Sequence, residues 1–164
     1  MNYYLEKVTW AHEWELIRKW RNAQIDILRQ GHVITLDEQN EYIKEYEEEK
    51  KLALPSRDLY MFTDGTKPIG YGGFVHIKWE DSNAEISFLI DPVKKRDLLQ
   101  YTMEWLIFLK MLREQSIRIG IKTWRSETPF STDPTRKIHV EVIRQLFKPR
   151  ETMLKNSVIQ EWEI

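Results

Sequence analysis

The stretch that decides the fold is residues 69–90, which read IGYGGFVHIKWEDSNAEISFLI. Aromatic and β-branched residues fill the two runs 69–78 and 84–90, and a short polar segment separates them, which is the pattern of two strands joined by a turn. A third apolar run, 59–63, comes just before the Asp64-Gly65 turn. We therefore predict a three-stranded antiparallel meander in the middle of the chain.

Upstream of the meander, the sequence predicts one strand followed by helices. Residues 3–8 suit a short strand, and Thr9 is a candidate cap for the first helix. Apolar residues recur there at helical spacing: Trp10, Trp14, Ile17 and Trp20. We expect a short helical piece at 26–29. Thr35 and Glu38 have the spacing of a capping box for a helix that continues to about Lys51.

Downstream of the meander, we predict a helix over 97–113 that is buried against the sheet. Its apolar residues cover much of its surface: Leu98, Tyr101, Met103, Trp105, Leu106, Phe108, Leu109 and Leu112. The alternation of Ile117, Ile119 and Ile121 predicts a strand. A helix over 135–146 should start at Asp133-Pro134, and 152–154 with 158–164 should form a final hairpin. The predicted fold class is mixed α+β, with a mostly antiparallel central sheet flanked by helices.

Length and composition favour a single domain over residues 1–164. Lys and Arg number 25 and Asp and Glu number 26, so the formal net charge of −1 gives no reason to expect a nucleic acid or a membrane as partner. Cysteine is absent, which excludes disulfides and thiolate chemistry. The N-terminus has no signal-peptide pattern, and we expect the protein in the cytoplasm.

Several chemistries have no support in the sequence. The four histidines are isolated, so we expect no metal site, and no Gly-x-Ser-x-Gly motif is present. The glycine-rich segment 70–73 lacks the Lys-Ser/Thr that follows in a phosphate-binding loop. Two interpretations of its glycines stay open. They indicate either a bulge or close approach of a ligand to the backbone, or a strand that needs small residues against a neighbouring helix.

Short stretches of the sequence carry a family resemblance. They are Trp20-Arg21-Asn22, Gln24 with Leu28-Arg29-Gln30, Gly70-Tyr71-Gly72-Gly73, the segment AEISFLI at 84–90, and Ser126-Glu127-Thr128. In this order and spacing they resemble the GNAT acetyltransferase family. The first is similar to the branch with ribosomal-protein N-terminal and nucleotide-sugar N-acetyltransferases, and the others to a bacterial group associated with surface-polysaccharide synthesis. The resemblance runs from about Tyr4 to the end. It implies a GNAT-like fold and acetyl-CoA as co-substrate.

The chain departs from the family pattern at two places. A glycine-containing pyrophosphate loop should follow the strand that ends at Ile90, but residues 92–99 read PVKKRDLL. The Gly-Phe after the last helix is reduced to Leu146-Phe147. The resemblance implies that Phe88, Leu89 and Ile90 offer backbone groups to the pantetheine arm. We expect the charges of Lys94, Lys95 and Arg96 to bind the pyrophosphate, the alternative being a basic exposed turn.

The proton-handling residues are predicted from position and chemistry. Glu85 resembles the family's general base, and its carboxylate can take a proton from an ammonium group directly or through water. The alternative is a carboxylate that only pairs with an arginine across the sheet. His76 is the competing base. The family's general acid is commonly a tyrosine in the last helix, where this chain has Ile143 and no tyrosine, so Tyr71 or water is the remaining candidate.

Acceptor contacts are expected from aromatic, amide and charged side chains of the early helices and the meander: Trp20, Arg21, Gln24, Arg29, Gln30, Tyr71, Trp79 and Glu127. This mixture suits a nucleotide-linked amino sugar, because aromatic faces stack on rings and arginine binds phosphate. The leading hypothesis is N-acetylation of an amine on a sugar or sugar nucleotide. Acetylation of a protein N-terminus or lysine, and a catalytically idle binding domain, are the alternatives. For Trp20 itself, packing in the core is the favoured interpretation.

Overall fold

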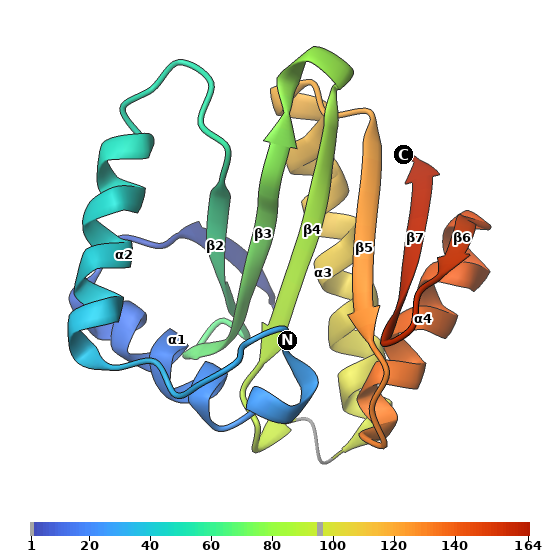
Figure 1. The fold of residues 1–164 in the computed structure, drawn as a ribbon, viewed down its shortest axis with the longest axis horizontal. Helices are drawn as coiled ribbons and strands as arrows, with labels where there is room; N and C mark the ends of the chain where they lie inside the picture. The colour runs from blue at the N-terminus through green and yellow to red at the C-terminus, as the bar shows by residue number, and fades with distance from the viewer. Residues whose placement is uncertain (1, 95–96) are drawn as a thin grey trace.

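The structure, a computed structural model, describes residues 2–94 and 97–164 (Figure 1). Its centre is a seven-stranded sheet in the order β1-β2-β3-β4-β5-β7-β6. The strands are β1 (Tyr4–Lys7), β2 (Asp58–Thr63), β3 (Pro68–Lys78), β4 (Asn83–Ile90), β5 (Thr123–Pro129), β6 (Arg150–Met153) and β7 (Ser157–Glu163). Only β4 and β5 pair in parallel, and every other neighbouring pair is antiparallel. The predicted meander is confirmed as β2, β3 and β4, and the predicted α+β class is confirmed.

Helices cover both faces of the sheet (Figure 1). They are α1 (Ala11–Asn22) and α2 (Leu36–Glu49) on one face, and α3 (Leu98–Ile119) and α4 (Pro134–Phe147) on the other. Strand residues alternate between the two cores, as the period of two requires. Tyr60 and Phe62 pack in the α3/α4 core, whereas Leu59 and Met61 pack in the α1/α2 core.

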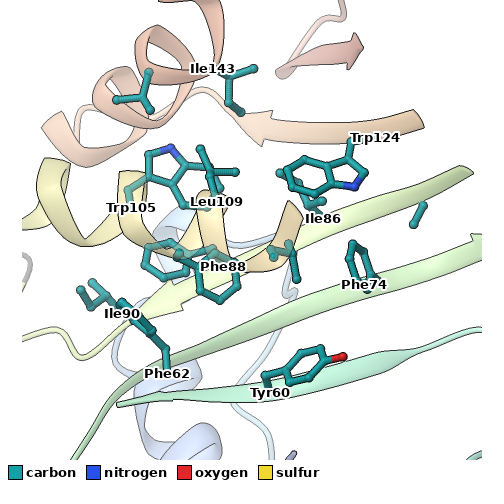
Figure 2. Close-up of a cluster of buried hydrophobic side chains, with 14 of the residues drawn as sticks. Tyr60, Phe62, Phe74, Ile86, Phe88, Ile90, Trp105, Leu109, Trp124 and Ile143 are labelled. Atoms are coloured by element: carbon teal, nitrogen blue, oxygen red, sulfur yellow. The ribbon is translucent and has the colours of Figure 1, made fainter. Parts of the chain in front are cut away.

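The α3/α4 core contains much of the aromatic content. Figure 2 shows Phe88 of β4 beside Trp105 and Leu109 of α3, and the rings of Phe88 and Trp105 stack with centroids 4.8 Å apart. The same alternation along β4 points Glu85, Ser87 and Leu89 toward the α1/α2 face. Thus β4 places hydrophobic anchors on one face and a carboxylate on the other.

Two early elements differ from the prediction in their boundaries. Helix α1 is capped at Trp10 rather than Thr9, because the Glu13 carboxylate accepts the N–H groups of Thr9 and Trp10 at 2.9 and 2.8 Å. The short helical piece is a single 3₁₀ turn, η1 (Ile25–Ile27). A second 3₁₀ turn, η2 (Trp79–Asp81), joins β3 to β4. The capping box of α2 is confirmed at Thr35 and Glu38.

The largest error concerns residues 117–121, which belong to a helix end and not to a strand. Helix α3 continues to Ile119 and ends at Gly120, whose φ of 84° is the left-handed geometry of a helix C-cap. Ser116 Oγ accepts the indole N–H of Trp124 at 2.6 Å, which ties the last turn of α3 to β5. The expected apolar surface of α3 is also partly wrong, because three of its residues are exposed: Leu98, Met103 and Leu106.

The glycines of β3 are explained by packing against β4 and α3. A Cβ on Gly72 would lie 2.1 Å from the Ser87 carbonyl oxygen and 2.9 Å from Phe108 Cζ. Gly73 has a φ of 144°, which an L-residue rarely adopts. The second interpretation of the glycine-rich segment, small residues against a neighbouring helix, is therefore the one that fits.

A gap opens in the sheet between β4 and β5. The two strands pair only where residues 83–85 of β4 lie beside residues 123–125 of β5. Beyond Glu85, β4 stays paired with β3 to Ile90, and beyond Arg125, β5 stays paired with β7 to Pro129. The two halves of the sheet therefore diverge, as Figure 1 shows where β4 and β5 separate toward their C-terminal ends.

Candidate active site

A cavity of about 100 Å³ occupies the gap between β4 and β5. Its walls come from both faces of the sheet: Ile27, Leu28, Arg29, Val75, Glu85, Ile86, Ser87, Phe88, Ser126, Glu127, Thr128, Pro129, Arg136 and His139. Antiparallel ladders alternate between bonded and outward-facing residues. Asp91 N–H donates to Ile69 C=O, so every second residue of β4 counted back from Asp91 bonds to β3. The residues between them, including Ile86 and Phe88, therefore point their backbone N–H and C=O groups into this gap. An extended polar chain could therefore pair with the open edge of β4.

On the α1/α2 face, four side chains form a closed ring of alternating charge, which we term the charge ring: Arg29, Glu85, Arg125 and Glu127. Glu85 accepts from Arg29 and, at 2.7 Å, from Arg125. Glu127 accepts from the same two arginines at 3.0 and 3.2 Å. Two cations balance two anions, and Glu85 is only 4% exposed. The ring fixes the Glu85 carboxylate where β4 and β5 begin to separate.

His76 lies beside the charge ring on a bulged part of β3. Its Nδ1 is 3.3 Å from Glu85 Oε2, and its imidazole is 68% exposed. Its backbone has a φ of 50°, a left-handed conformation that is uncommon for residues other than glycine and is often found at functional sites. The structure thus brings together the two predicted bases, one buried and one open to solvent.

A larger cavity, about 420 Å³, adjoins the gap on the α1/α2 face. Its lining includes Arg21, Arg29, Gln30 and Tyr71 of the predicted acceptor contacts, together with Trp14, Ile17, Gly31, His32, Ile34, Glu38, Gln39 and Tyr42. Arg21 Nε donates to Gln30 Oε1 at 3.1 Å. Burial raises the pKa of Tyr71, so its phenol stays protonated at neutral pH and can donate a hydrogen bond. Arg29 borders both cavities.

Three predicted acceptor contacts have other roles in the structure. Trp20 is buried in the α1/α2 core, as its alternative interpretation held. Gln24 is buried, and its amide donates to the carbonyl of Ile90 at 2.8 Å, which holds the free end of β4. Trp79 belongs to η2 beyond the paired end of β4, and its indole donates to Pro55 C=O at 2.8 Å. The sequence could not show at which end of β4 the gap opens, because this depends on where β5 pairs. It therefore could not show that Trp79 lies at the other end.

The predicted pyrophosphate contacts lie partly outside the described residues, which exclude Lys95 and Arg96. Lys94 is described, and its Nζ is 3.6 Å from Asp64 and 3.9 Å from Glu104. Its charge is therefore already engaged with carboxylates. Of the predicted pantetheine contacts, the side chains of Phe88, Leu89 and Ile90 are all buried. Among their backbone groups, the carbonyl of Ile90 is occupied by Gln24.

Sequence reasoning missed two residues of α4 that line the gap, Arg136 and His139. The His139 ring stacks on Trp105 with centroids 4.1 Å apart, and its Nε2 is 3.4 Å from Ser126 Oγ. Burial, and then the nearby charge of Arg136, lower the pKa of His139 well below its usual value, so the imidazole is neutral. The three-residue spacing of Arg136 and His139 puts them on one face of a helix and was the available signal.

Comparisons with known proteins agree on the fold. No protein-family model matches the sequence, and no curated protein matches it either. Among solved structures, an N-acetyltransferase from Staphylococcus aureus Mu50 is similar, with a TM-score of 0.66, 13% identity, and coverage of 100% of this chain and 98% of that one. Campylobacter jejuni N-acetyltransferase PseH in complex with acetyl coenzyme A is also similar, with a TM-score of 0.65, 15% identity, and coverage of 99% of each chain. Spermidine N-acetyltransferase from Vibrio cholerae in complex with CoA and spermine has a TM-score of 0.70 and 12% identity, with coverage of 99% of this chain and 94% of that one. The chain therefore has the fold of the GNAT N-acetyltransferases.

Proposed function

We propose that this chain is an acetyl-CoA-dependent N-acetyltransferase that acetylates the amine of an amino sugar, most favourably one linked to a nucleotide. The observation that carries the proposal is the gap between β4 and β5, whose cavity is lined from both faces of the sheet. An acyl donor on the α3/α4 side can meet an acceptor amine on the α1/α2 side there. Acetyl coenzyme A bound to a structure of the same fold supports this donor.

The reaction needs an unprotonated amine, access to the thioester carbonyl and a proton for the leaving thiolate. The ammonium form first loses one proton, the amine nitrogen then attacks the carbonyl carbon, and the C–S bond breaks. The second amine proton goes to the leaving thiolate, so the products are the acetamide, CoA thiol and the one proton lost from the ammonium. Glu85 stands at the meeting point of the two cavities and is the proposed acceptor of the ammonium proton. Because its oxygens are engaged by Arg29 and Arg125, the amine must reach it by displacing Arg29, which is 48% exposed, or through water.

The acceptor class follows from the chemistry of the larger cavity. Arg21 supplies positive charge outside the charge ring, while Trp14, Tyr42 and Tyr71 supply aromatic surfaces. The single carboxylate in the lining, Glu38, is occupied by the Thr35 backbone and by His32, and its pKa is lowered to about 2. A polyamine such as the spermine of the V. cholerae complex would need free carboxylates. Cations beside aromatic rings instead favour a phosphate-bearing acceptor with a flat base.

The experiment is an acetyl-transfer assay on a matched acceptor panel. It compares a nucleotide-linked amino sugar with the same amino sugar lacking the nucleotide, with spermidine and with peptides that carry a free N-terminus or lysine. We expect the nucleotide-linked acceptor to have the highest kcat/KM and to lose most of that advantage in Arg21→Gln. Preference for spermidine or a peptide would contradict the acceptor class. Absence of transfer to all of them would favour the idle binding domain.

A further inference from the structure

Arg136, in the first turn of α4, is a buried cation that forms no ion pair with a carboxylate of the described residues. It is 8% exposed, and its Nη2 donates a hydrogen bond to the hydroxyl of Tyr101 at 3.0 Å. Its Nε has no hydrogen-bond partner within residues 2–94 and 97–164, and in that part of the chain no carboxylate forms an ion pair with its guanidinium. A guanidinium has five N–H donors, and the buried Nε–H of Arg136 is one that the described residues leave unused.

Such a group is costly for the protein alone. A buried charge is normally paired, because removing it from water is strongly unfavourable. Tyr101 cannot compensate the charge, since burial raises the pKa of its phenol and keeps it neutral. In the adjacent helix cap, Asp133 Oδ1 accepts from the backbone N–H and the hydroxyl of Thr135. An unpaired buried arginine therefore points to an anionic ligand.

The surroundings of Arg136 describe a place for this ligand. Arg136, Thr128 and His139 line the gap between β4 and β5, and Thr128 Oγ1 and His139 Nδ1 also lack partners within the described residues. Tyr101 is in the first turn of α3, so its contact with Arg136 joins the beginnings of α3 and α4. Figure 1 shows both helices starting at the end of the sheet where β4 and β5 are farthest apart. The buried cation and two residues with unused polar atoms thus line the same cavity.

We propose that Arg136 binds the phosphate groups of the acyl donor from α4. This inference rests on the proposed function and adds the residue that supplies the positive charge. The segment PVKKRDLL at 92–99 contains no glycine, so close approach of backbone N–H groups to phosphate is not available there as it is in a glycine-rich loop. A guanidinium can instead form two parallel hydrogen bonds to phosphate oxygens. Neutral His139 adds no competing charge.

The test uses Arg136→Met, with Lys137→Met as the matched control, since Lys137 is the next residue of the same helix and is exposed. Binding of CoA, of pantetheine and of inorganic pyrophosphate is measured by calorimetry, together with the melting temperature without ligand. We expect Arg136→Met to weaken CoA by about 10- to 100-fold, as charge-assisted hydrogen bonds do, and to abolish pyrophosphate binding. Pantetheine, which lacks phosphate, should bind equally to all three proteins. The unliganded variant should melt no lower than the wild type, because it loses an uncompensated charge.

Two results would overturn the proposal. One is an equal loss of CoA and pantetheine binding, which would place Arg136 beside the thioester end. The other is a lower melting temperature with unchanged CoA affinity, which would make Arg136 structural. A wild-type protein that binds pyrophosphate through Arg136 but binds no CoA would refute the proposed function and the donor assignment together, while leaving Arg136 as the anion-binding residue.

Discussion

At the scale of single residues, the contacts of Glu85 fit both of the roles that the sequence left open. It forms the cross-strand pair with Arg125 that a structural role requires, and it also stands where the two cavities meet. Its burial and its distance of 3.3 Å from His76 keep a proton path to solvent within reach. The contact pattern of Glu85 therefore supports both a structural and a proton-accepting role, and a substitution is needed to separate them.

Glu85→Gln should lower turnover on the order of 100- to 10000-fold, the usual range for loss of a general base, while CoA affinity stays near that of the wild type. The defect should shrink as pH approaches the pKa of the acceptor amine, because the amine then loses its proton unaided. Glu127→Gln is the matched control, since it removes the same charge from the charge ring and should cost much less. Initial rates over a pH series measure both variants. Equal losses in the two would assign Glu85 to structure and make His76→Gln the next substitution.

The two site residues of α4 could not be predicted from the sequence, for a physical reason. Arg136 and His139 look like ordinary polar positions of an amphipathic helix, and a sequence does not reveal that their partners are missing. Only the positions of β5 and α3 show that their nitrogens lie buried beside a cavity. By contrast, Glu85, Arg29 and Glu127 were predicted, and the structure brings all three into one ring.

At the scale of elements, strong periodicity predicted the structure well and weak periodicity did not. The meander of β2 to β4 and the capping box of α2 follow from local sequence alone. The end of α3 did not, because isoleucine at 117, 119 and 121 fits a strand, while tertiary packing and Gly120 extend the helix. Strand β5 was missed because its sequence TWRSETP is polar. Of its three buried positions, Trp124 packs in the α3/α4 core, whereas Ser126 and Thr128 line the gap beside α4.

The fit of α3 on β3 gives a prediction about stability. Gly72→Ala should lower the free energy of unfolding by about 1–3 kcal/mol, because the added methyl group would overlap both a carbonyl of β4 and the ring of Phe108. Gly31→Ala is the control, since no atom lies within 4 Å of a Cβ placed there. Urea unfolding measures both. If Gly72→Ala were as stable as Gly31→Ala, the close packing of α3 on β3 would be wrong.

At the scale of the whole molecule, the sheet separates two kinds of surroundings and the gap connects them. The α3/α4 side holds Arg136, His139 and a large aromatic core, and the α1/α2 side holds the charge ring and the cavity with Arg21 and Tyr71. Donor and acceptor can therefore reach the reacting centre from opposite faces without sharing a binding surface. The account depends on one claim, that the acyl donor binds in this gap.

Calorimetric titration with acetyl-CoA tests that claim most directly, with Ser87→Trp as the variant that fills the cavity from β4. The wild type should bind one acetyl-CoA per chain and saturate below about 1 mM, the upper end of usual enzyme KM values. Ser87→Trp should remain folded by circular dichroism and lose the binding, because the indole would occupy the cavity in which the donor is proposed to lie. Absence of saturable binding by the wild type, or equal binding by both proteins, would contradict the account.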